Sequence, residues 1–587
     1  MIQEKMITGY PSIDKPWEKY FTDNDRNIEI PKCTVYQNIY EKNKEYLYDT
    51  AIIYYGNHIN YNKLFKYTED SAKALRKIGI KRGDCVTLCT AAVPEAIYLV
   101  LACSRVGAIA NFINPMFSTQ QMIDRINETG AEWIFILDAM YSYIEKALPE
   151  TCIKHVVIIP ATNSIPVLLS KLLYFKSDAK RILKQKENQQ KEFLHWSRFV
   201  DKGYDYVGEI DVEYQPDTPA VMVYSSGTTG ASKGILLTND GMNATIANYQ
   251  TDNFTRWYDR KSTMLQMIPI WFSTGIVLSL LMPLTNGATV IPEPKFSKET
   301  FVDDILKYRP SICLTATSLW IHVMESEKTK NADLSHFTLP FTGGEKVLAL
   351  DEVRLNDFLK NHGCDKPLYK GYGMCELGST VATHVESEMY TPKLGGTGYP
   401  MLNAMVAAFD MTTNQELKYG ERGEIRVCSP GRMKGYYKNP EATKEFFKTD
   451  ENGNIWGCTG DIGYIDEDGE VFILGRATDC YKRENGDTVY LFDIEEEIFE
   501  EPLVNQCKVV DIKEDEKTKL VAHIVFKDGT TEPERIVKRI DEYLKTKLSD
   551  YMTPSYYKIR SSMPVHSNGK RDVEALRNDK EGLLRME

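Results

Sequence analysis

Hydrophobic and polar positions along the first 160 residues repeat with two alternating periods. Apolar side chains recur at helical spacing within residues 62–79, and the apolar run 85–88 follows a turn rich in glycine. Residues 94–105 predict a second helix, while the short apolar runs 133–137 and 156–159 predict buried strands. Helices that alternate with buried strands are typical of an α/β fold with a largely parallel sheet.

The pattern changes within residues 161–200. Leucine, isoleucine and alanine recur there at helical spacing beside a series of lysine and arginine side chains, which predicts a basic amphipathic stretch. Such a stretch could contact anionic lipid headgroups. A solvated helix that packs on its own lobe is the more common explanation of the same pattern.

The character of the chain changes again toward its C-terminus. Strand-like runs at 508–512 and 521–526 enclose a charged turn, and a helix-like segment follows at 533–547. These features predict a compact α+β unit of ordinary domain size. Because 587 residues exceed what a single core usually holds, we expect a large N-terminal lobe at 1–476 and a small C-terminal lobe at 477–587.

Charge and cysteine content narrow the class of protein. The formal net charge is −12, which argues against a nucleic-acid partner because phosphate contact requires a basic surface. The 12 cysteines include no Cys-x-x-Cys pair, so they predict reduced thiols rather than a zinc site. Residues 1–21 lack an apolar signal-peptide core, and the longest apolar runs are shorter than a membrane span. We therefore expect a cytoplasmic protein.

The first chemical motif is a glycine- and hydroxyl-rich loop at residues 224–234, Tyr-Ser-Ser-Gly-Thr-Thr-Gly-Ala-Ser-Lys-Gly, directly after a strand-like run. Small residues let successive backbone N–H groups approach an anion, and Lys233 adds positive charge, so the loop predicts a phosphate site. The Walker pattern is not matched, because Gly234 stands where Ser or Thr would follow the lysine. A single loop of this composition is more often a flexible linker.

Further motifs follow in order. They are 371–376 (Gly-Tyr-Gly-Met-Cys-Glu), 456–461 (Trp-Gly-Cys-Thr-Gly-Asp), 474–476 (Leu-Gly-Arg) and 564–570 (Pro-Val-His-Ser-Asn-Gly-Lys), with supporting segments at 342–345, 423–425 and 435–436. Each one alone is more often an exposed turn. Together, in this order and spacing, they resemble the adenylate-forming superfamily, which includes acyl-CoA synthetases, firefly-type luciferases and the adenylation domains of peptide synthetases. The resemblance implies that family's fold, an α/β multi-sheet large lobe with a mobile α+β small lobe.

The resemblance also implies roles for individual residues. Nucleotide-binding positions would be Ser225, Ser226, Gly227, Thr228, Thr229, Gly230, Lys233, Gly344, Glu345, Tyr372, Gly373, Cys375, Asp461 and Arg476. The acid would lie beside Trp271, Phe272 and Gly344. Glu376 would hold Mg²⁺, as suits a hard carboxylate ligand, and Lys570 would bridge the reacting carboxylate and the α-phosphate, where a fixed cation stabilises developing charge.

The implied chemistry uses ATP and Mg²⁺ to form an acyl-adenylate, and coenzyme A to take up the acyl group. This sequence departs from the family pattern at four places. Cys375 replaces a Thr that contacts phosphate, Phe272 replaces a common His, Thr478 stands at the hinge position, and the loop 482–486 is one residue longer than usual. The last two bear on the thiol step.

Three functions remain open at this stage. The first is an acyl-CoA ligase of fatty acid metabolism that acts on a fatty or other apolar carboxylic acid, with a peripheral contact to the inner membrane surface through 165–187. The second is a free-standing adenylation enzyme that loads a separate acyl carrier protein. The third is a non-catalytic protein that binds nucleotide or membrane, since a fold alone never proves activity.

Overall fold

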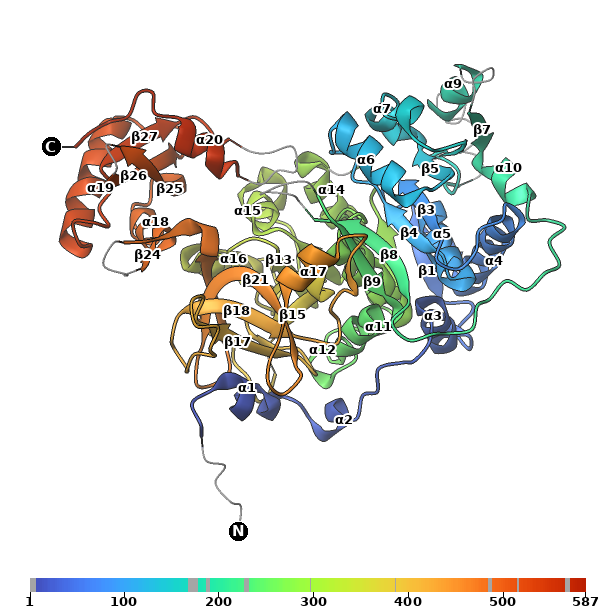
Figure 1. The fold of residues 1–587 in the computed structure, drawn as a ribbon, viewed down its shortest axis with the longest axis horizontal. Coiled ribbons are helices and arrows are strands. Elements are labelled where there is room, and N and C mark those ends of the chain that lie inside the picture. Colours follow the sequence, from blue (N-terminus) through green and yellow to red (C-terminus); the bar gives the residue numbers. More distant parts are fainter. Residues whose placement is uncertain are drawn as a thin grey trace, which may run out of the picture. The chain divides into compact units, whose positions relative to one another are not determined.

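The structure is a computed structural model, and two compact units of very different size make up the chain (Figure 1). It describes residues 7–166, 178–185, 191–225, 232–295, 297–385, 387–483, 488–514, 517–564 and 571–586. The large unit comprises Met1–Glu421, Arg426–Thr459 and Tyr464–Phe472; the small unit comprises Arg422–Ile425, Gly460–Gly463 and Ile473–Glu587. The predicted α/β multi-sheet large lobe with a small α+β lobe is confirmed, while the boundary at 476 and 477 stays a prediction.

A nine-stranded sheet runs through the large unit in the order β16-β15-β14-β13-β12-β10-β11-β1-β2. Its strands are β1 (Thr50–Tyr54), β2 (Asn57–Asn60), β10 (Thr263–Gln266), β11 (Thr289–Pro292), β12 (Ile312–Thr315), β13 (Leu339–Gly343), β14 (Tyr369–Met374), β15 (Ser379–Thr383) and β16 (Tyr399–Pro400). From β14 to β1 all neighbours are parallel, and antiparallel pairs stand only at the two edges. Parallel strands are buried on both faces, which explains their continuous apolar runs.

An eight-stranded sheet has the order β19-β9-β8-β4-β3-β5-β6-β7. Its strands are β3 (Cys85–Cys89), β4 (Ile109–Phe112), β5 (Trp133–Leu137), β6 (His155–Ile159), β7 (Glu192–His195), β8 (Pro219–Tyr224), β9 (Gly234–Thr238) and β19 (Gly435–Tyr436). The strands from β8 to β7 are parallel, whereas β9 pairs antiparallel with β8 and β19. The predicted parallel sheet of the first half is therefore confirmed.

Helices connect these strands and cover the sheets. The main ones are α3 (Val35–Asn43), α4 (Tyr61–Lys77), α5 (Pro94–Val106), α6 (Thr119–Thr129), α9 (Asp178–Gln185), α10 (Trp196–Asp201), α11 (Asn239–Asn248), α14 (Lys298–Tyr308), α15 (Thr317–Glu325), α16 (Ala349–Asn361) and α17 (Pro440–Phe446), with a π-helix, η4 (Thr274–Leu281). One core cluster packs α14, α15 and α16 around Trp320 and Phe301 against β10–β12. The helices predicted at 62–79 and 94–105 are α4 and α5.

The basic stretch is described only in part, because residues 167–177 and 186–190 lie outside the described residues. Its helix α9 places Ala179 and Ile182 in the core cluster of the eight-stranded sheet, where they are 0% and 1% exposed. Lys180, Arg181 and Lys184 lie on the polar side. The apolar face of α9 is thus covered by its own lobe. Across the described ranges, no helix combines the length and apolar character that crossing a bilayer requires.

A third, smaller sheet contains β17 (Met405–Phe409), β18 (Gly423–Cys428), β20 (Phe447–Thr449), β21 (Ile455–Ile465) and β22 (Val471–Arg476). The small unit folds around β25 (Val504–Glu514), β26 (Lys517–Phe526) and β27 (Tyr556–Arg560), with α18 (Leu491–Phe499), α19 (Pro533–Lys547), α20 (Val573–Asn578) and a hairpin of β23 (Cys480–Lys482) and β24 (Thr488–Tyr490). Its core joins α18 and α19 to the sheet through Ile498, Leu544 and Tyr557. The strands predicted at 508–512 and 521–526 and the helix at 533–547 are confirmed.

Candidate functional site

Three of the predicted motifs meet at one edge of the nine-stranded sheet. Trp271 and Phe272 follow β10, Gly344 and Glu345 follow β13, and Glu376 follows β14. These strands are parallel, so their carboxyl ends share an edge. Strand β10 lies between β11 and β12, so the direction of the strand order reverses there. Ligands of open α/β sheets bind outside the carboxyl ends of the strands at such a reversal.

The turn from β14 to β15 requires glycine and places Glu376. A Cβ atom at Gly373 would lie 1.6 Å from the carbonyl oxygen of Ser379, so only glycine fits there. Beyond it, Cys375 and Glu376 form a single 3₁₀ turn, and the Glu376 side chain is nearly buried, with the residue 8% exposed. Tyr372 stands half-buried on β14 itself. The close approach of two backbones thus holds an aromatic ring and a carboxylate at fixed positions.

The ends of the predicted phosphate loop are clamped together. The backbone N–H of Ser225 donates to the carbonyl oxygen of Lys233 at 3.0 Å, and the N–H of Lys233 donates to Oγ of Ser225 at 2.9 Å. Ser226, Gly227, Thr228, Thr229 and Gly230 lie outside the described residues. Because β8 and β9 form an antiparallel pair on either side, the neck of the loop presents the half-buried Lys233 side chain at a defined place.

Tyr436 connects Lys233 to Glu376. Its hydroxyl donates to Oε1 of Glu376 at 3.0 Å, and Nζ of Lys233 lies 5.1 Å from the centre of its ring. Burial, together with the negative charge of Glu376, raises the pKa of Tyr436, so its hydroxyl stays protonated and acts as a donor. The ammonium and the carboxylate, 143 positions apart in the sequence, are joined through one side chain.

The predicted acid-binding segment is apolar and tightly packed. The rings of Trp271 and Phe272 are half-buried, with centres 6.3 Å apart. A Cβ atom at Gly275 would lie 2.1 Å from the carbonyl oxygen of Pro269, so the turn into η4 has no room for a side chain. Oγ1 of Thr274 lies 3.0 Å from Oγ of Ser379, which ties this segment to β15. A π-helix such as η4 often marks a functional site.

Glu345 has a structural partner. Its carboxylate accepts hydrogen bonds from the backbone N–H and the hydroxyl of Ser318, at 3.1 and 3.3 Å, in the first turn of α15. Gly344 is exposed, and its φ of +81° lies in the left-handed region that favours glycine. The segment after β13 is therefore held by a helix N-terminus, a position that stabilises a carboxylate.

The small unit carries two further predicted nucleotide-binding residues. Asp461 is 8% exposed and forms an ion pair with the guanidinium of Arg476, whose side chain is 53% exposed. The carbonyl oxygen of Thr478, at the predicted hinge, accepts a hydrogen bond from Arg577 at 3.4 Å. Lys570 and residues 484–487 of the longer loop lie outside the described residues. The structure thus brings Asp461 and Arg476 together within one unit.

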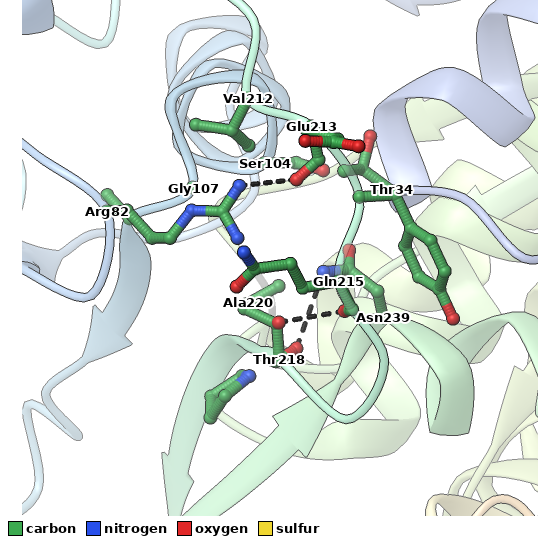
Figure 2. Close-up of a pocket in the computed structure, with 13 residues that line it drawn as sticks. Thr34, Arg82, Ser104, Gly107, Val212, Glu213, Gln215, Thr218, Ala220 and Asn239 are labelled. Carbon is green, nitrogen blue, oxygen red and sulfur yellow. Dashed lines mark hydrogen bonds between the residues drawn. The ribbon is translucent and has the colours of Figure 1, made fainter.

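A small pocket lies apart from these motifs (Figure 2). Its lining includes Thr34, Arg82, Glu213 and Asn239, and none of its 13 lining residues belongs to a predicted motif. The guanidinium of Arg82 donates to the backbone of Glu213, so it anchors the segment that leads into β8. This pocket contributes packing and gives no indication of ligand chemistry.

The role of Tyr436 was not predicted from the sequence. Residues 435–436 stand there only as a supporting segment, because a Gly-Tyr pair carries no local signal of function. Lys233 lies directly before β9 and Glu376 lies in the turn after β14, and the antiparallel pairing of β19 with β9 brings the tyrosine to them. Tyr436, three residues past the buried Met433, could have been identified only from its distances in space.

Comparison with known proteins identifies relatives over nearly the whole chain. A family model described as AMP-binding enzyme matches residues 39–437, and a model described as AMP-binding enzyme C-terminal domain matches 493–570. A 4-coumarate–CoA ligase of Petroselinum crispum is 26% identical over 488 residues, 82% of each chain. A long-chain-fatty-acid–CoA ligase of Bacillus subtilis (strain 168) is 24% identical over 562 residues, 95% of this chain and 96% of that one.

Solved structures share the fold. ATP-bound MatB from Rhodopseudomonas palustris superposes with a TM-score of 0.76 at 21% identity, covering 92% of this chain and 98% of that one. An O-succinylbenzoate coenzyme A synthetase from Bacillus subtilis, in complex with ATP and magnesium ion, superposes with a TM-score of 0.70 at 20% identity, covering 92% and 99%. At these identities the likeness establishes the architecture of both lobes.

Proposed function

Because the chain belongs to the AMP-binding enzyme family, of the adenylate-forming superfamily, we propose that it activates an apolar carboxylic acid with ATP and transfers the acyl group to coenzyme A. The expectation of an acyl-CoA ligase-like member of this superfamily is confirmed. The observation that carries the proposal is the meeting of Lys233 and Glu376 on Tyr436 beside the strand ends that also hold Trp271 and Phe272.

The donor set suits a magnesium nucleotide. Mg²⁺ in nucleotide sites is usually held by one or two carboxylates together with the substrate's phosphates. Glu376 offers such a carboxylate, nearly buried and already hydrogen-bonded by Tyr436. Among the described residues no group of three or more His, Cys, Asp and Glu side chains forms a site that would hold a metal alone. The residues present therefore fit a metal that arrives with ATP, and when bound Mg²⁺ neutralises phosphate charge.

The chain's own residues would bind and orient the reactants. Ser225, Lys233 and the loop 226–230 would surround the pyrophosphate portion of ATP, with Cys375 beside it. Tyr372, Gly373, Gly344 and Glu345 would enclose the adenine, and Asp461 with Arg476 would bind the ribose. The acid's carboxylate oxygen forms a bond to the α-phosphorus while the bond to pyrophosphate breaks, and Lys570 would stabilise the charge that develops. Positioning and charge neutralisation supply most of this catalysis.

Two observations support an apolar acid. Trp271 and Phe272 present aromatic surface at the end of β10, and η4 behind them is almost entirely apolar and buried. The acids named for two of the relatives, 4-coumarate and long-chain fatty acids, both have large apolar bodies. Apolar and aromatic linings with few polar groups are typical of sites for such ligands. We therefore propose an aromatic or fatty acid as the substrate.

Pyrophosphate release from ATP and Mg²⁺ tests the proposal. The acids are acetate, hexanoate, palmitate, 4-coumarate and benzoate, each with and without coenzyme A, and AMP and thioester are measured alongside. Release with one apolar class, increased by coenzyme A, is expected. Release that leaves adenylate bound and ignores coenzyme A would indicate a carrier-protein acceptor instead.

A pair of lysine variants serves as control. Lys233→Met removes the ammonium at the loop neck and should lower turnover by about 100-fold, as expected for loss of one charge that stabilises a transition state. Lys434→Met removes an exposed ammonium that pairs with Asp217, and it should leave turnover unchanged. If the wild type binds ATP but releases no pyrophosphate with any of the acids, the proposed ligase activity is wrong and a nucleotide-binding protein remains.

A further inference from the structure

Tyr436 is fixed in place from several sides. As part of β19 it pairs with Ile235 of β9, and its backbone N–H donates to Oγ1 of Thr443 at 2.9 Å. Gly435 before it allows this approach, since a Cβ atom there would lie 2.8 Å from Cγ2 of Thr443. The next residue, Tyr437, donates its N–H to the carbonyl oxygen of Gly234 at 2.7 Å. The ring of Tyr436 therefore has little freedom relative to the loop neck.

The backbone around Glu376 is tied to the same segment. The N–H of Met433 donates to the carbonyl oxygen of Glu376 at 2.8 Å. Three residues later, Tyr436 reaches the carboxylate of the same residue with its hydroxyl. Main chain and side chain of Glu376 are thus both held by residues 433–436, which orients the carboxylate independently of any ligand.

The face of the Tyr436 ring receives Lys233. An ammonium over an aromatic ring within about 6 Å of its centre is attracted by the ring's negative face, and the separation here is 5.1 Å. The ring also forms a T-shaped pair with Phe446, with centres 6.2 Å apart. One side chain therefore presents two different groups, a hydroxyl and a π-face, to two charged residues of opposite sign.

We propose that Tyr436 is a positioning residue for magnesium-ATP binding: its hydroxyl orients the Glu376 carboxylate toward the metal, and its ring holds the Lys233 ammonium at the phosphate loop. This inference rests on the proposed function for the ligand, but it concerns binding and not turnover. Carboxylates that ligate metals are in general held by a further hydrogen bond, and loss of that bond typically weakens metal affinity 10- to 100-fold. The two groups of the side chain make separable contributions.

Two substitutions separate them. Tyr436→Phe keeps the ring over Lys233 and removes the hydroxyl that bonds Glu376. Tyr436→Leu removes both. Tyr437→Phe is the matched control, because Tyr437 is the adjacent tyrosine, also carries a lysine over its ring, Lys438 at 5.3 Å, and packs against the core of the eight-stranded sheet. The full chain is used throughout, and thermal unfolding checks that each variant is folded.

The measurement is calorimetric binding of ATP without acid or coenzyme A, repeated across a magnesium titration. We expect Tyr436→Phe to shift the magnesium concentration needed for half-maximal ATP affinity upward by about 10-fold, with ATP affinity at saturating magnesium close to wild type. Tyr436→Leu should add a loss of about 10-fold in ATP affinity that saturating magnesium does not restore. Tyr437→Phe should match the wild type in both quantities.

A Tyr436→Phe variant whose magnesium dependence equals that of Tyr437→Phe would overturn the proposal, even with a lowered unfolding temperature, because a purely structural tyrosine would change stability alone. Should Tyr436→Leu fail to fold, the isosteric phenylalanine variant still decides the outcome. Because the readout is binding, this test does not depend on the proposed ligase activity. Magnesium-dependent ATP binding without turnover of any acid would contradict the ligase activity, and the role of Tyr436 in binding would still be tested.

Discussion

Among the described residues, each unit has one almost fully buried lysine, and the pKa values of these two lysines shift in opposite directions. In the large unit, the side chain of Lys370 on β14 is 5% exposed and contacts Glu352 of α16 at 2.7 Å. In the small unit, the side chain of Lys508 on β25 is 7% exposed and contacts Asp479 at 2.7 Å and Glu495 at 3.0 Å. Burial lowers the pKa of Lys370 despite Glu352. Burial acts in the same direction on Lys508, but its two carboxylates outweigh it and raise the pKa.

The difference lies in how many charges share the site. His384, 3.6 Å from Glu352, does not add a positive charge, because burial lowers its pKa to about 3. Glu470 acts on Lys370 only at longer range. One carboxylate in contact with a buried ammonium thus does not offset the free-energy cost of its desolvation, whereas two carboxylates do. The sign of a buried lysine's pKa shift follows from its partners and not from burial alone.

The largest effect is expected for Lys508→Met, which removes the ammonium that pairs with the mostly buried carboxylates of Asp479 and Glu495. Breaking a buried ion pair from one side costs about 3–5 kcal/mol, and two stranded carboxylates favour the upper end. Hydrogen exchange followed by mass spectrometry on the full chain should show this loss of unfolding free energy as faster exchange in β25 and β26. Lys513→Met, at an exposed position of the same strand, is the control. A loss below about 1 kcal/mol would contradict the two-carboxylate account.

A smaller decrease in the free energy of unfolding, about 3 kcal/mol, is expected for Lys370→Met. Only Glu352 is stranded at contact distance, and a single buried carboxyl can take up a proton instead of remaining charged. Exchange should increase in β14 and α16, and ATP affinity should fall, because Tyr372 lies two residues along the same strand. Lys360→Met, on the exposed side of α16, provides the control. Equal losses for Lys370→Met and Lys508→Met would break the comparison.

Neutralising a carboxylate partner of the replaced lysine as well should restore more of the lost stability in the large unit than in the small one. The double variant Lys370→Met with Glu352→Gln is expected to recover about 2 kcal/mol, since no buried charge remains at contact and the amide oxygen can still accept from the N–H of Gly395. Lys508→Met with Asp479→Asn should recover about half as much, because Glu495 stays buried. The coupling energies of the two double-mutant cycles measure this difference, and equal rescue would contradict it.

The smallest effect concerns pH. Burial raises the pKa of Glu470 to about 7, above its value of 4.5 in an unfolded chain. Between these values the folded protein binds more protons than the unfolded one, so stability decreases as pH rises through this window. The free energy of unfolding of the large unit should fall by about 1 kcal/mol between pH 6 and pH 7. Glu470→Gln should remove that slope in hydrogen exchange of β21 and β22, and a slope that persists would assign it to other groups.

Local patterns predicted the regular elements well. The periodicities at 62–79 and 533–547 correspond to α4 and α19, and the apolar runs at 133–137 and 508–512 lie in β5 and β25. The order of five short motifs was sufficient to indicate the superfamily. These signals are local because helix and strand periods, and the small residues of a tight loop, depend on neighbours along the chain.

Long-range contacts were decided by the tertiary structure alone. The sequence predicted that Lys233 and Glu376 belong to nucleotide-binding motifs, but the tyrosine between them became visible only once β19 paired with β9. The sequence around Lys370 or Lys508 also does not show how many carboxylates surround each lysine, because Glu352 and Glu495 come from helices packed against the sheets. Electrostatic energies depend on distance and dielectric in space. The sequence of this chain therefore predicts its secondary-structure elements and motifs, whereas tertiary packing determines which charged groups come into contact and how much free energy their burial requires.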